Sequence, residues 1–308
     1  MNFDCPPVLV VFFNRPDVLR QNLRALSRIG PRQLFLACDG PREGVPTDHT
    51  RVEECQRLAL EMVDWDCVVE TMFAVRNHGC DSWVPEAVSW FFSRVDSGII
   101  LEDDCVIDHG FARFAAELLD KYRDEPRVMN ISAANFQNKI WGEADYYFSA
   151  YPSNWGWASW ARAWRAYDGQ LDRVECFIKT PRFASLITNR TQRRFWMRFY
   201  KALRAGERTF WDAKWLLSIW ASDGVSITPN MNLVRNVGFG DDATHTKDKS
   251  DAVVMTINDL PRELIHPVTS YDISVEADKY LFSLRYKPKL YARAKNLFRI
   301  FFNLLSAR

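Results

Sequence analysis

Residues 99–106 read Ile-Ile-Leu-Glu-Asp-Asp-Cys-Val, a short apolar run followed directly by three acids. The apolar run predicts a buried strand. Glu102, Asp103 and Asp104 repel one another at its end unless a cation or an arginine compensates their charge. A hard divalent ion with oxygen ligands, Mg²⁺ or Mn²⁺, is the natural partner of such acids. Because such an ion commonly bridges carboxylates to a diphosphate, this stretch indicates a nucleotide-type substrate.

Strands and helices alternate around this stretch. Further strands are predicted at 7–13, 33–38, 67–73 and 128–132, and helices at 18–26, 51–62, 81–95 and 111–122. This order predicts an α/β fold with a mainly parallel sheet covered by helices on both faces.

Polar residues follow two other predicted strands. Asn14-Arg15 ends the first strand and Asp39-Gly40 ends the second, as the acids end the fourth. In parallel sheets these ends share one edge, and ligands bind beyond it. We therefore expect Arg15, Asp39 and the acids to border one site.

Composition and charge narrow the class of protein. The chain has 308 residues, 47% of them hydrophobic, and a formal charge of +1, which argues against bulk electrostatic binding to nucleic acid. Its 12 tryptophans suit either a sugar-binding surface or a large core. The seven scattered cysteines form no CxxC pair, and neither a signal peptide nor a membrane span is visible. We expect a cytoplasmic protein.

Asp212 is the candidate general base. It lies among Phe210, Trp211 and Trp215, and aromatic surroundings tend to raise the pKa of a carboxylate. The neighbouring indole rings could stack on the apolar face of a sugar. The alternative is an Asp that caps a helix beside core aromatics.

An aromatic block occupies residues 141–167. Within it, 151–157 is predicted to be a shaped loop because Pro152, Asn154 and Gly156 interrupt it. Trp157, Trp160 and Trp164 have the spacing of one helical face, which favours core packing for them. The loop residues are better candidates for ligand contact.

Two late segments carry further candidates. The glycine-containing stretch 238–245 could close over a ligand, and its His245 could contact a diphosphate or metal, or be structural. Asp241-Asp242 is a second, lower-ranked acidic option for metal. Residues 287–308 hold six basic and no acidic residues, which suits a membrane-surface helix or a helix docked on the core. We divide the chain into a domain at 1–270 and a C-terminal tail at 271–308.

Taken in order, these pieces resemble a GT-A glycosyltransferase over roughly residues 7–250. The likeness is to bacterial family 2-like nucleotide-diphospho-sugar transferases, related to the N-acetylglucosaminyltransferase I group. It lies in Leu101-Glu102-Asp103-Asp104, Phe210-Trp211-Asp212, the 151–157 loop and the 237–245 segment. The chain departs from those relatives at 81–85, where it lacks their nucleotide-binding histidine.

On the donor side, the resemblance implies a GT-A fold and five roles. Arg15 would contact the nucleotide, and Asp39 would bind the base, uracil in the relatives. Asp103 would bind the ribose, Glu102 would lie near the donor sugar, and Asp104 would hold Mn²⁺ or Mg²⁺.

On the acceptor side, Asp212 would be the catalytic base, with Trp211 beside it. Trp155 and Trp157 are further candidates for sugar contact, and His245 is a second candidate metal ligand.

The function we expect is metal-dependent, inverting transfer of a sugar from a nucleotide diphosphate, with UDP-sugar favoured. The acceptor would be a hydroxyl of a glycan, a lipid-linked molecule or a protein. If the basic tail binds lipid, the protein would lie at the inner face of the membrane. The alternatives are a non-catalytic carbohydrate-binding protein and a metal-dependent nucleotide-sugar pyrophosphatase.

Overall fold

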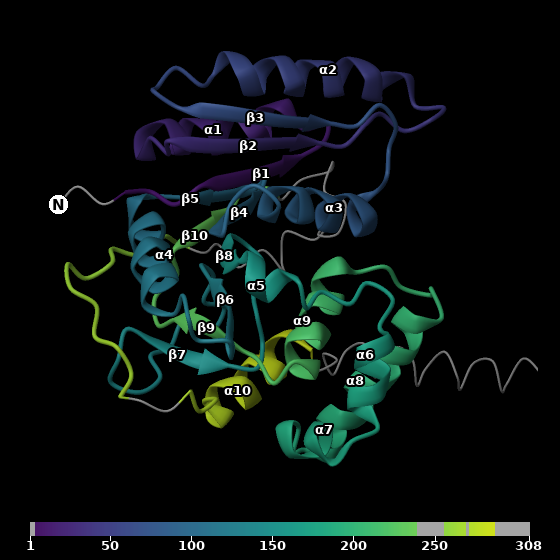
Figure 1. The fold of residues 1–308 in the computed structure, drawn as a ribbon, viewed down its shortest axis with the longest axis vertical. Coiled ribbons are helices and arrows are strands. Elements are labelled where there is room, and N and C mark those ends of the chain that lie inside the picture. The colour runs from purple at the N-terminus through teal and green to yellow at the C-terminus, as the bar shows by residue number, and fades with distance from the viewer. Residues whose placement is uncertain (1–3, 239–255, 269–270, 287–308) are drawn as a thin grey trace, which may run out of the picture.

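An eight-stranded sheet runs through the computed structural model, which describes residues 4–238, 256–268 and 271–286 (Figure 1). Within these residues the strand order is β3-β2-β1-β4-β8-β6-β9-β7. The strands are β1 (Val8–Phe12), β2 (Gln33–Cys38), β3 (Val68–Phe73), β4 (Ser97–Glu102), β6 (Val128–Ser132), β7 (Tyr146–Ser149), β8 (Trp157–Trp160) and β9 (Val225–Pro229). The short strands β5 (Cys105–Ile107) and β10 (Val234–Asn236) pair separately.

The sheet is mainly parallel, as expected. The first four strands in its order pair in parallel, β8 runs antiparallel between β4 and β6, and β7 runs antiparallel at the edge. All five residues of β1 are buried, which is typical of a central strand with both faces covered. Its register with β4 places Val11 opposite Glu102, so the acids follow β4 at the carboxyl end of the parallel strands.

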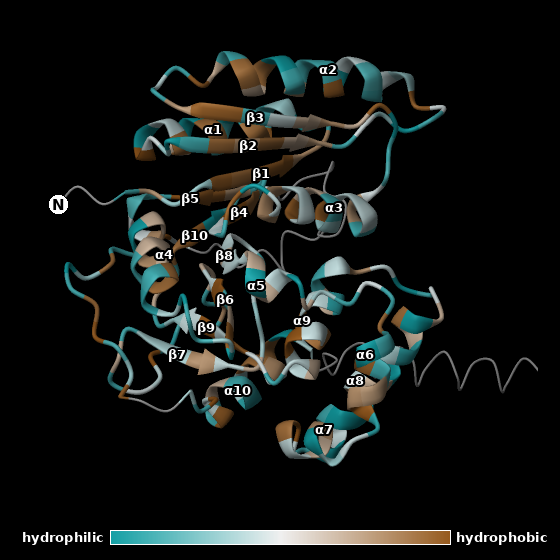
Figure 2. Ribbon diagram, in the orientation of Figure 1, coloured by the Kyte–Doolittle hydropathy of each residue, from teal (hydrophilic) through white to brown (hydrophobic). Residues whose placement is uncertain are grey.

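Helices cover both faces of the sheet. They are α1 (Pro16–Ile29), α2 (Pro46–Glu61), α3 (Cys80–Phe92) and α4 (His109–Lys121) in the first half. Phe35 of β2 contacts Phe91 of α3, whereas Cys38 interacts with Cys55 of α2. Side chains three positions apart on a strand point to opposite faces, so α2 and α3 lie on opposite sides. Figure 2 shows the apolar strands β1 and β2 between these more polar helices. The α/β class, the mixed sheet and the two helical layers are therefore confirmed.

A second hydrophobic cluster lies under the other half of the sheet. Its helices are α6 (Asp172–Ile178), α7 (Pro181–Leu186), α8 (Arg190–Arg204), α9 (Trp211–Ala221) and α10 (Val275–Arg285), with the single turn α5 (Ala161–Trp164) before them. Trp196 of α8 and Trp220 of α9 meet with ring centroids 5.0 Å apart. Leu281 and Phe282 bring α10 into the same cluster, beside β7. Packing in this cluster holds α9 in place.

The helical face predicted for Trp157, Trp160 and Trp164 is wrong. Trp157 and Trp160 begin and end strand β8, and only Trp164 is helical. The backbone groups of 157–160 pair with β4 and β6 on either side, and this pairing outweighs a local helical spacing. The core position expected for the three rings is correct, because each is at most 5% exposed.

The basic stretch 287–308 and most of the 238–245 segment, including His245 and Asp241-Asp242, lie outside the described residues. The part of the tail that is described, α10, packs on the domain. Among the described ranges, no helix combines the length and the apolar character needed to cross a bilayer.

Candidate functional site at the strand ends

A cavity of about 470 Å³ opens at the carboxyl ends of the parallel strands. Arg15 reaches it from the end of β1, and Glu102 and Asp104 from the end of β4. Trp155 comes from the loop before β8, and Asp212 from the first turn of α9. Residues nearly 200 positions apart in the chain thus border one cavity. Of the residues expected at the shared sheet edge, Arg15, Glu102 and Asp104 line it, whereas Asp39 and Asp103 do not.

Arg15 compensates two of the three acids. Its Nε donates to Oδ2 of Asp103 at 3.1 Å, and a terminal nitrogen donates to Oδ1 of Asp103 and, at 3.1 Å, to Oδ2 of Asp104. Asp103 is only 3% exposed, because its amide extends the ladder onto the Val11 carbonyl. Asp103 therefore ties the strand end to Arg15 and does not line the cavity, whereas Asp104 and Arg15 do.

Glu102 faces the cavity without such a partner. Burial and the charges of Asp104, Asp103 and Asp212 raise the pKa of Glu102, and Arg15 only partly opposes them. In the described part of the chain, no side chain donates a hydrogen bond to its carboxyl group. The acids at this corner are thus poorly compensated, and a bound cation would favour the ionised form of Glu102.

This donor set fits a hard divalent cation. Mg²⁺ is typically held by one or two carboxylates, with water and substrate phosphates completing the shell. Glu102 and Asp104 supply two such carboxylates on the cavity wall. Among the described residues, no cluster of three His, Cys, Asp or Glu side chains is arranged to hold a metal ion. Further ligands would thus have to come from the substrate, water or residues outside that set.

The end of the glycine-containing segment touches the acids. The Val237 amide donates to the Asp104 carbonyl at 2.9 Å, and a Cβ added to Gly238 would lie 2.2 Å from Oδ2 of Asp104. Only a glycine allows the backbone this close to the carboxylate. Closure of the 238–245 segment over a ligand stays a prediction.

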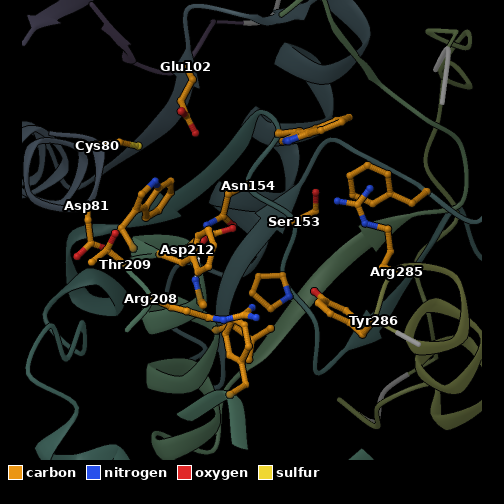
Figure 3. A pocket seen from close by; sticks show the side chains of 18 of the residues that line it. Cys80, Asp81, Glu102, Ser153, Asn154, Arg208, Thr209, Asp212, Arg285 and Tyr286 are labelled. Carbon is orange, nitrogen blue, oxygen red and sulfur yellow. Dashed lines mark hydrogen bonds between the residues drawn. The ribbon is translucent and has the colours of Figure 1, made fainter. Parts of the chain in front are cut away.

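Asp212 lies in the first turn of α9 and points into the cavity (Figure 3). The N-cap position of α9 belongs to Phe210, so Asp212 is not the capping residue considered above. Its Oδ1 accepts the Ala213 amide at 2.8 Å. Lys214, two residues on, donates to Asp81 of α3 at 2.6 Å, with both side chains largely buried. This ion pair fixes the start of α9 against α3 and so positions Asp212.

The aromatic candidates separate into wall and core. Trp155 is partly exposed, lines the cavity and meets Phe136 edge-on, with ring centroids 5.0 Å apart. Trp211 lines the cavity but is 5% exposed, packed 6.1 Å from the Trp157 ring. Trp157 itself is 1% exposed and does not line the cavity. Trp157 therefore belongs to the core and not to the predicted sugar contact, because a buried core ring offers no face to a ligand.

Asp39 lies apart from the cavity. Its carboxylate accepts the amides of Gly40 and His78 at 2.8 Å and of Gly79 at 2.9 Å, and the Asn77 side chain at 2.9 Å. These bonds tie the 77–79 loop to the end of β2. Burial raises the pKa of Asp39, and the three amides oppose that shift. Base binding by Asp39 stays a prediction.

Sequence reasoning missed several cavity residues. Both polar atoms of the Asn154 side chain and the hydroxyl of Ser153 are buried without a hydrogen-bond partner in the described ranges. Arg208 before α9, and Arg285 and Tyr286 at the end of α10, also line the cavity. The interrupted 151–157 loop pointed to Ser153 and Asn154. No spacing in the sequence links 208 to 285.

No protein-family description and no curated protein matches this chain. Among solved structures, a mannosyltransferase from Pyrobaculum calidifontis in complex with GDP-Man and Mn²⁺ aligns at 15% identity and a TM-score of 0.33, over 55% of this chain and 46% of that one. This chain thus spans about half the length of that enzyme. A 4-diphosphocytidyl-2C-methyl-D-erythritol synthase from Anaerococcus prevotii aligns at 8% identity and a TM-score of 0.31, over 53% and 76%. A UDP-glucose pyrophosphorylase complexed with UDP-glucose aligns at 7% identity and a TM-score of 0.30, over 52% and 78%.

Proposed function

We propose that this chain is a metal-dependent, inverting glycosyltransferase that moves a sugar from a nucleotide diphosphate, with UDP-sugar favoured, to an acceptor hydroxyl. One observation carries the proposal. A single cavity has Glu102, Asp104 and Arg15 on one wall and Asp212 on another. The first group suits a diphosphate and its counter-ion, and the second is a separate carboxylate that can accept a proton.

The donor would bind at the acid corner. Asp104 and Glu102 would hold Mg²⁺ or Mn²⁺, which supplies positive charge to the leaving diphosphate. Arg15 adds a second positive charge at the same corner and keeps Asp103 and Asp104 in place. Binding of the ribose by Asp103 and of the base by Asp39 is part of the same proposal.

Transfer then needs one base. The acceptor hydroxyl oxygen bonds to the anomeric carbon as its proton passes to the Asp212 carboxylate. The bond from that carbon to the diphosphate oxygen breaks, and the nucleoside diphosphate leaves with the electron pair. Attack from the face opposite the leaving group inverts the anomeric centre. Trp155 and Trp211 border the cavity near this base and would contact the acceptor sugar.

The products identify the reaction. The wild-type protein should be incubated with a panel of nucleotide sugars and Mn²⁺, with nucleoside diphosphate, nucleoside monophosphate and sugar phosphate separated by chromatography. A transferase releases the nucleoside diphosphate, slowly even to water. Sugar phosphate with nucleoside monophosphate would instead identify a pyrophosphatase, and binding without turnover a carbohydrate-binding protein. Either outcome overturns the proposal.

Asp212→Asn tests the base. We expect a loss of transfer of about 10²–10⁴-fold with Mn²⁺-dependent donor binding retained. The matched control is Asp172→Asn, which changes an exposed first-turn acid of α6, outside the cavity. Near-normal turnover by Asp212→Asn would remove Asp212 from the base role.

The role of the tail is a separate proposal. We propose that residues 287–308 hold this cytoplasmic protein at the inner face of the membrane, where a lipid-linked acceptor would lie. Sedimentation with vesicles containing anionic lipid should show binding by the full chain and weaker binding by a chain ending at 286. Equal binding by the two proteins would contradict a membrane role.

A further inference from the structure

The cavity has a second end that the donor chemistry does not use. Arg208 and Arg285 line it, together with Phe136, Phe199 and Tyr286. Figure 3 shows Arg208 and Arg285 on two different sides of the cavity, both away from Glu102. The acid corner and the two arginines are therefore distinct parts of one space.

Neither guanidinium is neutralised in the described part of the chain. Arg285 lies 4.1 Å from the centroid of the Phe136 ring and 5.6 Å from that of Trp155. Arg208 lies 5.5 Å from the centroid of the Phe199 ring. No carboxylate of a described residue is within ion-pair distance of either group. Arg15, by contrast, is paired with acids, as is Arg204 with Asp172.

Stacking of this kind leaves the N–H groups available. A guanidinium over a ring is held by its flat face, while its donors point outward in the plane. The planar donor fork matches two oxygens of a phosphate or carboxylate. Two such groups on one cavity, neither within ion-pair distance of a described carboxylate, give a site of matching charge for an oxyanion.

From this arrangement we infer that the Arg208–Arg285 end of the cavity binds a phosphate group on the acceptor. The inference rests on the proposed function, because it assigns the acceptor to the end opposite the donor corner. The phosphate is carried either by a sugar or by a lipid anchor. The partly exposed rings of Phe136, Phe199 and Tyr286 on the same cavity suit either a sugar face or an alkyl chain.

Binding of small phosphates tests the inference without a known acceptor. Calorimetric titration in EDTA, which keeps metal from recruiting phosphate to the acid corner, should compare glucose 6-phosphate with glucose and hexyl phosphate with hexanol. At least one phosphate should bind about tenfold or more tightly than its neutral counterpart. The preferred phosphate identifies the carrier. No preference in either pair would overturn the inference.

Variants locate the phosphate. Arg208→Gln and Arg285→Gln should each weaken phosphate binding about tenfold, and Arg285→Lys should recover part of the loss. Arg204→Gln is the matched control, since Arg204 is an exposed arginine paired outside the cavity, and it should bind as the wild type does. Unchanged binding by both cavity variants would overturn the inference.

Donor binding separates this inference from the proposed function. UDP with Mn²⁺ should bind equally to the wild type and to both cavity variants. If the variants also lose UDP, the arginines serve the donor and the inference is wrong. If the wild type binds phosphate through these arginines but transfers no sugar from any donor, the proposed function fails and the anion site stands.

Discussion

Replacing Arg15 with methionine is the sharpest test of how the acid corner is held together. Methionine keeps an apolar stem of similar length and removes only the charged group. Asp103, 3% exposed, would lose both hydrogen bonds from Arg15 and keep the Asp104 amide. Removing one partner of a buried ion pair is strongly destabilising because the other charge is left uncompensated.

The cost has a ceiling set by protonation. A carboxyl group that loses its partner can take up a proton, at about 1.4 kcal/mol for each pH unit above its usual pKa of about 3.9. The loss of unfolding free energy is therefore at most about 4 kcal/mol at pH 7. It is much smaller at pH 5, because burial raises the pKa of Asp103 to about 6 even beside Arg15 and the carboxyl group is then largely protonated in the wild type too. In the Arg15→Met variant the pKa of Asp103 is raised in the folded state above its value in the unfolded chain. Stability is present at low pH and lost as pH rises through the window between the two pKa values.

Urea unfolding at pH 5 and pH 7, with and without Mn²⁺, measures both effects. Mn²⁺ should restore part of the stability of Arg15→Met, because a cation can replace the lost charge at Asp103 and Asp104. The matched control is Arg42→Met, which breaks the 2.6 Å pair between Arg42 and the buried Asp48, outside the cavity. Mn²⁺ should not rescue that variant. Wild-type stability of Arg15→Met at pH 7, or equal rescue of both variants, would refute the reasoning.

Asp278, Gly238 and two tryptophans give three further predictions. Burial raises the pKa of Asp278 in the folded protein to about 7. The protonated carboxyl group therefore stabilises the fold fully below the pKa of the unfolded chain, and this stabilisation is lost as the pH rises through about 7. Urea unfolding should show that Asp278→Asn removes about 2 kcal/mol of the stability difference between pH 5 and pH 7, and an unchanged profile would contradict the assignment. Gly238→Ala should displace the Asp104 side chain and weaken Mn²⁺-dependent UDP binding about tenfold, measured by calorimetry. The melting temperature should be nearly unchanged. Wild-type affinity would show that Asp104 can move without loss of binding. Trp157→Leu should lower the free energy of unfolding by about 3 kcal/mol in chemical denaturation. Trp155→Leu should lower it by under about 1 kcal/mol and should raise the KM for the acceptor. Equal losses of stability would mean that both rings lie in the core.

The residues at the sheet edge could be predicted because the end of each strand is marked by nearby residues in the sequence. An apolar run followed by polar residues locates a strand end, and parallel strands bring such ends together whatever lies between them. This rule places Arg15 and the acids on one edge, and their direct contact also needs β1 to pair with β4. The sequence left open whether a cation or an arginine compensates the acids, and the structure has Arg15 beside them.

The errors and omissions arise where distant segments decide the outcome. Trp157–Trp160 has a helical spacing but becomes a strand because β4 and β6 pair with it from either side. Strand β5 forms beside the acids because β10, more than 120 residues later, pairs with it. Arg208 and Arg285 meet one cavity only through the packing of α8, α9 and α10. None of these partners leaves a periodic signal at the residue itself.

The wall supplied by α10 affects when the site can form during synthesis. The cavity uses a side chain at position 15 and others at 281, 285 and 286. The N-terminal part of the chain leaves the ribosome first, so the sheet edge can fold while α10 is still inside the exit tunnel. A nascent chain would therefore form the acid corner of the cavity before it forms the side that α10 supplies.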